Sequence, residues 1–433
     1  MSSLYSPDTP HANAAELAAF DALFAASSAI GATANGGLHR LAASAEDGAM
    51  RDLFSRWLSE HGFEVQVDAV GNLFGLVTLA PGKPYLLCGS HLDTQPNAGR
   101  FDGIYGVLAG AVAVASVARQ LRERGLTPAF NLAVVNWTNE EGARFQPSLI
   151  GSSVFMGSLP LEQALACRDG AGVSLGEALA AIGYRGEARA PLPLAGYAEL
   201  HVEQGATLEQ QALAIGVVRS TWAALKWRVR FDGEQNHTGP APMAVRRDAL
   251  LAAAHAIVAV RAEAARHGLK LHSSVGRLEV EPNSPNVVPA LARMLVEYRS
   301  PSTALLAEAG ERLRATLAEI ATATQTTFEI ESEQLREPSE LHHGLSELAL
   351  ATCAELGLAA SNSVTVAGHD AISLNRRYPT TLLFVPSRNG LSHNEAEFTA
   401  SADLHRGLHL LTALLFRAAT APGQYLPGAD HAH

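Results

Sequence analysis

The sequence predicts an α/β protein in which a small ferredoxin-like α+β module interrupts a larger domain. Two observations support this. Short, wholly apolar runs alternate with helical stretches on both sides of the chain's middle, which is typical of a parallel sheet buried on both faces. Between them, a strand of alternating apolar and polar residues opens a β-α-β-β-α-β order. A chain of 433 residues fits about two to three domains.

The strands of the larger domain are predicted from apolar runs that each end in turn residues. They cover residues 85–88, 130–137, 196–200 and 380–385. A helical stretch at 107–121 separates the first two runs, so strands and helices alternate. In open α/β sheets, ligands bind outside the carboxyl ends of the strands. The turns that follow these runs are therefore the place to look for functional side chains.

The inserted module begins at a strand with one apolar and one polar face. The apolar positions are Leu225, Trp227, Val229 and Phe231, and the polar ones are Lys226, Arg228 and Arg230. The predicted elements that follow are a helix at 247–267, strands at 273–280 and 293–298, a helix at 302–324 and a strand at 327–330. The first pattern then resumes with a helix at 345–356, strands at 364–366 and 380–385, and a helix at 403–418. We therefore divide the chain into 1–215, an insert at 216–330, and 331–433.

Composition excludes several classes of function. The net charge of −11 argues against nucleic acid or an anionic membrane as the partner. The longest apolar stretch, at 106–118, is too short to span a bilayer. The first residues contain no basic segment followed by an apolar one, so we expect no secretory signal. Cys88, Cys167 and Cys353 are too few and too scattered for a disulfide framework. We expect a cytoplasmic enzyme.

Potential metal ligands occur in five segments, each interpreted as a turn after a strand. They are His91 in GSHLDT, Asp102 in GRFDG, Glu141 in NEEGARF, His201 in HVEQG and His393 in RNGLSHNEAEF. Any one motif fits an ordinary histidine or a solvated acidic loop equally well, in a chain with 17 His and 43 acidic residues. Five such segments, with the spare carboxylate Glu140 beside one of them, indicate a two-metal hydrolase site.

The ligand types predict how two metals would be shared. Two divalent cations about 3.5 Å apart need a bridging carboxylate and further ligands on each side. We assign Asp102 as the bridge. His91 and His201 then belong to one metal, and Glu141 and His393 to the other. Imidazole and carboxylate ligands suit two divalent ions per subunit, which can be Zn, Mn, Co or Ni.

Two further carboxylates have predicted supporting roles. Asp93, two residues after His91, is placed to hold that imidazole, as metal-bound histidines usually require. Glu140 cannot easily ligate the same metal as its neighbour Glu141. A carboxylate just outside the ligand shell can take a proton from a water and return it to a leaving nitrogen. We therefore predict that Glu140 is the general acid–base.

The ordered motifs resemble the amidase, hydantoinase/carbamoylase branch of the M20 metallopeptidase-like hydrolases. The resemblance covers about residues 35 to 418 and includes NHTGPAPM and SRNGLSHNEAEF besides the segments above. It implies a phosphorylase/hydrolase-like metallo-exopeptidase catalytic domain with an inserted ferredoxin-like α+β lid domain, a dinuclear metal site, a homodimer through the lid, and hydrolysis of a ureido C–N bond. HVEQG separates this branch from the peptidases, which usually carry an acidic residue where His201 stands.

The resemblance also implies substrate contacts. His237, in GEQNHTGP, would polarise the scissile carbonyl in the partner subunit's site. Asn286 in PNVVP and Arg299 in EYRSP resemble lid residues that bind the substrate carboxylate, which the arginine fork matches bidentately. Gln204 would hydrogen-bond the ureido group. His369, in AGHDA, either contacts substrate or packs in the core, and the sequence favours neither.

Two departures from the family pattern concern neighbouring residues. The lid segment has Thr238 after the histidine where relatives more often have alanine, and Glu395 stands where many relatives carry proline. Neither position is a proposed ligand, but both leave the exact substrate open.

The hypothesis from the sequence is a metal-dependent N-carbamoyl-L-amino-acid hydrolase that yields amino acid, CO2 and ammonia. Allantoate amidohydrolase and beta-ureidopropionase use the same ligand set and remain alternatives. A non-catalytic binding protein on this scaffold is disfavoured because the ligands and Glu140 are all present. An aminoacylase or dipeptidase is disfavoured by HVEQG. In every alternative that is an enzyme, the partner is a small molecule.

Overall fold

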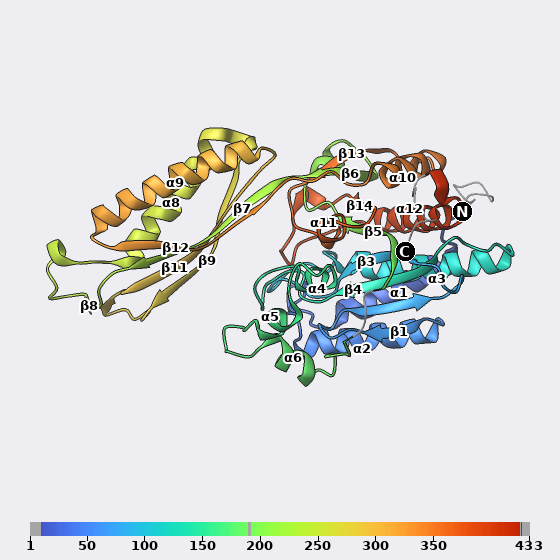
Figure 1. Cartoon of the computed structure of the whole chain (residues 1–433), viewed down its shortest axis with the longest axis horizontal. Coiled ribbons are helices and arrows are strands. Elements are labelled where there is room, and N and C mark those ends of the chain that lie inside the picture. The colour runs from blue at the N-terminus through green and yellow to red at the C-terminus, as the bar shows by residue number, and fades with distance from the viewer. Residues whose placement is uncertain (1–9, 189–191, 425, 427–433) are drawn as a thin grey trace. The chain divides into compact units, whose positions relative to one another are not determined.

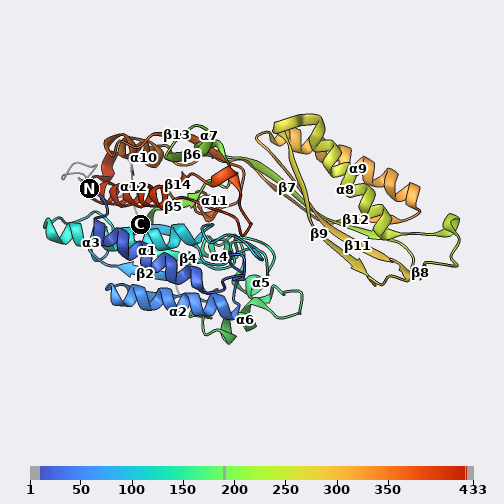
Figure 2. The ribbon, with the colours of Figure 1, turned by 180° about the vertical axis from the view of Figure 1, so that it is seen from behind.

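The computed structural model of the chain describes residues 10–188, 192–424 and 426 (Figures 1 and 2). It divides into two units. The large unit comprises the described residues of Met1–Arg219, Leu341–Ser363 and Gly368–His433. The small unit comprises Ser220–Glu340 and Val364–Ala367. The small unit is thus inserted into the large one along the chain, as the change in hydrophobic period predicts.

The large unit is built on one mixed sheet. Among the described residues it has eight strands in the order β1-β2-β4-β3-β5-β14-β6-β13. Their bounds are β1 Glu64–Val67, β2 Leu73–Val77, β3 Tyr85–His91, β4 Asn131–Trp137, β5 Leu194–Val202, β6 Ile215–Thr221, β13 Ala360–Thr365 and β14 Thr380–Val385. The four central strands, β4, β3, β5 and β14, run parallel. Their carboxyl ends therefore meet at one edge of the sheet.

Helices cover the sheet of the large unit (Figure 1). They are α1 Ala14–Ala29, α2 Ala45–Glu60, α3 Ile104–Glu123, α4 Ile150–Phe155, α5 Leu161–Ala166, α6 Leu175–Ala181, α7 Thr207–Gln210, α10 His343–Glu355, α11 Asp370–Leu374 and α12 Ser401–Thr420. The helix α3 packs against α12 and against β3, β4 and β5. It is long and apolar enough to cross a membrane, but 89% of its apolar window is buried inside the unit. It is a core helix, and it begins three residues before the predicted start at 107.

The small unit pairs a sheet with two helices. Its strands β7 Ala223–Asp232, β9 His272–Glu281, β11 Leu291–Ser300 and β12 Thr327–Arg336 form an antiparallel sheet in the order β12-β7-β11-β9. The helices α8 Ala249–His267 and α9 Thr303–Thr324 lie side by side on one face (Figures 1 and 2). The apolar positions of β7 pack against them in one core. The predicted β-α-β-β-α-β order is present, with the short pair β8 Asn236–His237 and β10 Val287–Val288 added.

The boundaries of the small unit differ from those predicted. The insert begins at Ser220 rather than 216 and ends at Glu340 rather than 330. The last strand was predicted at 327–330, but β12 continues to Arg336, which pairs with Ala224. Its second half is polar because it is an exposed sheet edge, so no apolar alternation marks it. Similarly, the segment 364–367 joins the small unit, where the backbone N–H of Trp222 donates to the carbonyl of Thr365 (2.9 Å).

Candidate metal centre

The turns after the parallel strands bring the five predicted ligands together in the large unit. His91 is the last residue of β3, and His201 lies one residue before the end of β5. Glu141 follows β4, and His393 lies in the loop after β14. Asp102 precedes α3 by two residues. These are the positions that parallel strand topology makes adjacent.

Asp102 is the centre of the cluster. Its Oδ1 lies 3.1 Å from Nε2 of His201 and 3.6 Å from Nε2 of His91. Its Oδ2 lies 3.2 Å from Nε2 of His393, which is also 3.5 Å from Oε2 of Glu141. The described residues form three groups with potential for metal binding, and two of them contain Asp102, one with His91 and His201 and one with Glu141 and His393. The third group is Glu199, His201 and His369. Asp102 is shared between the first two groups, as the sequence assignment requires of a bridge.

The imidazoles present the nitrogen that a metal needs. Nδ1 of His91 lies 2.9 Å from the backbone oxygen of Asp93, and Nδ1 of His201 lies 2.8 Å from that of Val202. A carbonyl oxygen only accepts, so we infer that Nδ1 carries a proton. Nε2 of each ring faces Asp102, where it donates to the carboxylate when protonated and is the nitrogen left to bind a cation in the neutral ring. Two donors at about 2.1 Å from one cation lie about 3.4 Å apart at a tetrahedral angle. The separations found, 3.1 and 3.6 Å, fit a cation between them.

The pKa values of the cluster also indicate that positive charge is stabilised beside Asp102. Burial alone would raise the pKa of Asp102, but hydrogen bonds from His201 and His393 outweigh it and hold the pKa well below its usual value. Burial would lower the pKa of His393, but its hydrogen bond to Asp102 raises that pKa to about 9. Positive charge beside Asp102 is thus favoured even in this buried place, and the donor set fits divalent cations.

Glu140 lies beside the cluster without joining either ligand group. It is buried, and its Oε2 is 3.5 Å from Nε2 of His91. Burial raises the pKa of its carboxyl well above the usual value, with a smaller opposing effect of His91. A buried carboxyl with a raised pKa beside the cluster is able to accept a proton and to return it.

Asp93 contacts the ring of His91 mainly through its backbone oxygen. It was expected to hold His91 through its carboxylate, but the ring contacts its backbone oxygen, and Oδ1 is 3.8 Å from Nδ1. Instead, its carboxylate accepts the backbone N–H groups of Glu140 (3.3 Å) and Glu141 (3.4 Å). Asp93 therefore fixes the acidic pair. Sequence spacing places a residue near a ligand but does not decide which of its atoms makes the contact.

Three further side chains hold the site and escaped the sequence analysis. The amide of Gln95 donates to Oε2 of Glu141 (2.9 Å). Glu199, fully buried, accepts from Ser90 Oγ and from the backbone N–H of Ala371, each at 2.7 Å. Glu397 contacts the segment that carries Asp102. The sequence does carry a signal for Glu199. It lies two residues before the predicted ligand His201 on the same strand, so the two side chains point to the same face of the sheet.

Gln204 and His369 lie beside the predicted ligands. Nε2 of Gln204 donates to Oδ2 of Asp102 (2.6 Å). Its Oε1 is buried and has no hydrogen-bond partner among the residues that the structure describes. His369 is buried with its ring centroid 4.6 Å from that of His201. Both side chains are thus part of the cluster's surroundings.

The predicted lid residues occupy opposite ends of the small unit. His237 pairs with Val287 in the short β8–β10 ladder, next to Asn286, whose carbonyl accepts from Thr238 (3.2 Å). Arg299 lies near the end of β11, eight residues beyond Leu291 and hence about 26 Å farther along the strand. The prediction that Asn286 and Arg299 bind one carboxylate together is therefore wrong within a single small unit.

Arg299 already has partners in its own unit. Its Nε and Nη2 donate to the two carboxylate oxygens of Glu297 (3.0 and 3.1 Å), and Nη1 donates to the carbonyl of Val366 (2.6 Å). Three of the five N–H groups of Arg299 are therefore engaged, which leaves two for a substrate carboxylate.

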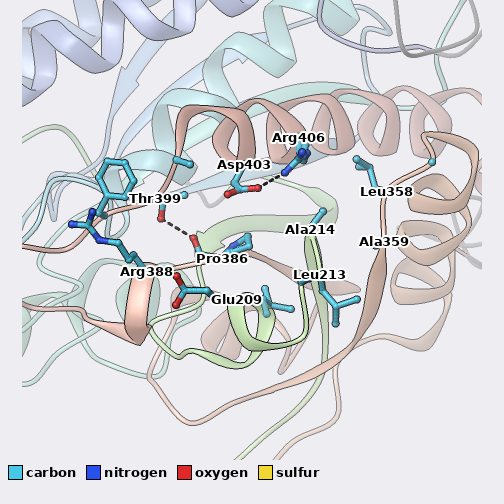
Figure 3. A pocket seen from close by; sticks show the side chains of 15 residues that line it. Glu209, Leu213, Ala214, Leu358, Ala359, Pro386, Arg388, Thr399, Asp403 and Arg406 are labelled. Carbon is cyan, nitrogen blue, oxygen red and sulfur yellow. Dashed lines mark hydrogen bonds and ion pairs between the residues drawn. The ribbon is translucent and has the colours of Figure 1, made fainter.

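A surface pocket of about 520 Å³ lies elsewhere on the large unit (Figure 3). Its lining, within the described part of the chain, includes none of the cluster's ligands. Its charged groups are partly paired, since Arg406 contacts Asp403 (2.6 Å). Both ends of the loop that carries His393 line it, and they are joined by a hydrogen bond from Thr399 Oγ1 to the carbonyl of Pro386 (2.9 Å). We assign the chemistry to the cluster, not to this pocket.

The family model described as Peptidase family M20/M25/M40 matches residues 87–417. The chain belongs to this family. It is 37% identical to an N-carbamoyl-L-amino-acid amidohydrolase of Rhizobium meliloti over 374 residues, covering 85% of this chain and 88% of the relative. It is 33% identical to an allantoate amidohydrolase of Bacillus subtilis over 394 residues, covering 90% and 94%.

A solved structure extends the likeness to the fold. The crystal structure of an amidase of the hydantoinase/carbamoylase family from Burkholderia vietnamiensis matches with a TM-score of 0.91 and 35% identity, covering 96% of this chain and all of that one. The resemblance found in the motifs and the predicted α/β fold class are confirmed. This M20 protein is an amidohydrolase, a hydrolase that acts on C–N bonds.

Proposed function

We propose that this M20 amidohydrolase cleaves the ureido C–N bond of N-carbamoyl-L-amino acids to give amino acid, CO2 and ammonia. The observation that carries the proposal is the pair of ligand groups that share Asp102, with the buried carboxyl of Glu140 beside them. The names of the Rhizobium meliloti and Bacillus subtilis relatives support a ureido substrate.

We propose that two divalent ions, Zn, Mn, Co or Ni, occupy the two groups. His91 and His201 would hold one and Glu141 and His393 the other, with Asp102 between them. When bound, such ions lower the pKa of a water and polarise the ureido carbonyl.

The side chains around the ligands divide the remaining tasks. Glu140 takes the proton of the attacking water and delivers it to the leaving nitrogen. The amide nitrogen of Gln204 is held by Asp102, and its Oε1, which has no partner among the described residues, is available to a ureido N–H group. His369 lies beside His201 and lines the site on the large unit.

We propose that the enzyme is a homodimer whose small units complete the sites. The β8–β10 pair, with His237 and the adjacent Asn286, is too far from Arg299 along β11 for all three to serve one substrate from one chain. Arg299 would bind the substrate carboxylate in its own chain's site, and His237 and Asn286 would reach the partner's. Large apolar side chains exposed on α8, Leu251 (47%) and Val258 (69%), support a dimer through this unit.

A cytoplasmic location remains part of the proposal. The cysteines at 88, 167 and 353 are free, which fits a reducing compartment.

A substrate panel tests the function. The metal-free protein would be loaded with Mn, Co, Ni or Zn and assayed for ammonia release from N-carbamoyl-L-amino acids, their D enantiomers, N-carbamoyl-β-alanine and allantoate, with dipeptides and N-acetyl amino acids assayed for amino acid release. We expect N-carbamoyl-L-amino acids to be the best substrates. Faster turnover of allantoate would favour that alternative. Cleavage of the dipeptides alone, or no turnover with both ions bound, would contradict the proposal.

Arg299→Ala should raise KM about ten- to hundredfold for substrates with a carboxylate, because a charge-assisted bidentate pair is lost. Steady-state kinetics on an N-carbamoyl amino acid and on a simple alkylurea, which lacks the carboxylate, would separate binding from catalysis. Arg293→Ala is the matched control, since Arg293 lies on the same strand and pairs with Glu331 (3.0 Å). An equal rise in KM for both substrates would contradict the assignment.

Mixing two inactive variants should restore activity if His237 acts in the partner's site. In a mixed dimer of His237→Ala and Glu140→Gln chains, one site has both residues intact, so roughly a quarter of the wild-type sites should work after random exchange. The recovered activity would be compared with subunit exchange measured on differently tagged chains. The control mixture, Asp102→Ala with Glu140→Gln, should recover nothing because both changes lie in the large unit. Full exchange without recovery in the first mixture would rule out action in trans.

A further inference from the structure

Glu397 joins the two loops that carry Asp102 and His393. It is 4% exposed and lies four residues after His393. Its Oε2 accepts the backbone N–H groups of Phe101 (3.1 Å) and Asp102 (3.3 Å). Its Oε1 lies 2.9 Å from Oγ of Ser392, the residue before His393. One buried carboxylate thus contacts both segments.

Ser392 connects Glu397 to the side chain of Asp102. Its Oγ lies 3.0 Å from Oδ2 of Asp102, the oxygen that also receives the amide of Gln204 (2.6 Å). The backbone of Asp102 is therefore held by Glu397, and its carboxylate is oriented by Ser392 and Gln204. The same oxygen faces His393 (3.2 Å). These contacts fix the position of Asp102, the proposed bridging ligand, relative to His393.

Gly99 permits the close approach of Glu397 because it has no side chain. A Cβ atom at Gly99 would lie 2.0 Å from Oε2 of Glu397 and 2.4 Å from its Cβ. Any side chain there would displace Glu397 from the backbone N–H groups that it accepts. The glycine two positions before Phe101 is therefore required for the close approach.

We propose that Glu397 is a positioning residue for the metal group formed by Asp102, Glu141 and His393. The inference rests on the proposed two-metal function. Glu397 acts by fixing the spacing of Asp102 and His393. Residues that orient metal ligands typically change metal affinity about 10- to 100-fold when they are substituted.

Glu395 supplies a matched comparison on the same loop. It is a glutamate two residues before Glu397, and its side chain also bridges to another segment, where it accepts from Thr33 Oγ1 and from the amide of Asn35 (2.8 Å). Within the described part of the chain, its side chain forms no hydrogen bond or ion pair with Asp102 or with the other ligands. A substitution at 395 therefore perturbs the loop without touching the bridge.

The test measures metal affinity in the full-length protein. Metal-free wild type, Glu397→Gln and Glu395→Gln would be titrated with Zn²⁺ and with Mn²⁺ against a chromophoric chelator, and their melting temperatures recorded. Gln at 397 keeps the size of the side chain but places an amide where a carboxylate oxygen accepts. We expect one of the two ions to bind about 10- to 100-fold more weakly in Glu397→Gln, with the other within about threefold of wild type. Glu395→Gln should keep both affinities.

Three outcomes would overturn the inference: unchanged affinities in folded Glu397→Gln, equal losses at 395 and 397, or equal weakening of both ions. If Glu397→Gln does not fold, Ser392→Ala gives the same test, because it removes the link to Oδ2 and should weaken the same ion. A wild type that binds two ions but hydrolyses no ureido substrate would contradict the proposed function and leave this comparison valid.

Discussion

Glu140→Gln should lower turnover by about two to four orders of magnitude, the usual scale for a positioned general acid–base group. The amide keeps the shape of the side chain but accepts no proton. Because Glu140 belongs to neither ligand group, the variant should retain its metal and its fold. Steady-state kcat with the best ureido substrate, and metal content of the same preparation, are the measurements.

Glu60→Gln, at the exposed end of α2, is a control for loss of a carboxylate away from the site and should keep wild-type turnover. Near-normal kcat in Glu140→Gln would assign proton transfer to another group. Loss of metal in that variant would instead make Glu140 a ligand.

Asp102→Ala should remove both ions and all measurable turnover. Three imidazoles, those of His91, His201 and His393, lie within 3.1–3.6 Å of its two oxygens, and both ligand groups need it. Metal content per chain after dialysis is the measurement, with a melting curve to show that the chain is folded. His393→Ala is the comparison, because it belongs to one group only and should leave one ion bound. A full complement of metal in Asp102→Ala would contradict the shared bridge.

The fold and the ligand cluster followed from local sequence patterns because parallel strands make distant turns adjacent. The apolar runs that end before His91 and Glu141 predicted β3 and β4. A strand buried on both faces is a nearly continuous apolar run, so its end is visible in the sequence. The alternation at 225–231 likewise predicted β7, because only one face of that sheet is covered.

The atoms that orient the ligands were less accessible to sequence reasoning. Nothing in the spacing shows that the carboxylate of Asp93 holds two backbone N–H groups while its carbonyl holds His91. Glu397 was hidden for the same reason, since its partners lie about 300 positions away and are backbone atoms. Long-range contacts to backbone leave no residue-type signature.

The separation of the lid residues also required the structure. The family resemblance implied that Asn286 and Arg299 bind the same substrate carboxylate. A strand of ten residues, β11, lies almost wholly between them and carries them to opposite ends of the small unit. Extended chain separates residues by about 3.3 Å per position. Asn286 and Arg299 are therefore far apart in space although they are close in sequence.

Turnover as a function of bound metal tests the central claim most directly. Metal-free protein would be titrated with Mn²⁺ while ammonia release from an N-carbamoyl-L-amino acid and bound metal per chain are measured on the same samples. Full activity is expected only when two ions are bound per chain, because the groups around Asp102 are both needed. Full ureido hydrolysis by protein that holds one ion per chain or fewer would contradict the two-metal account.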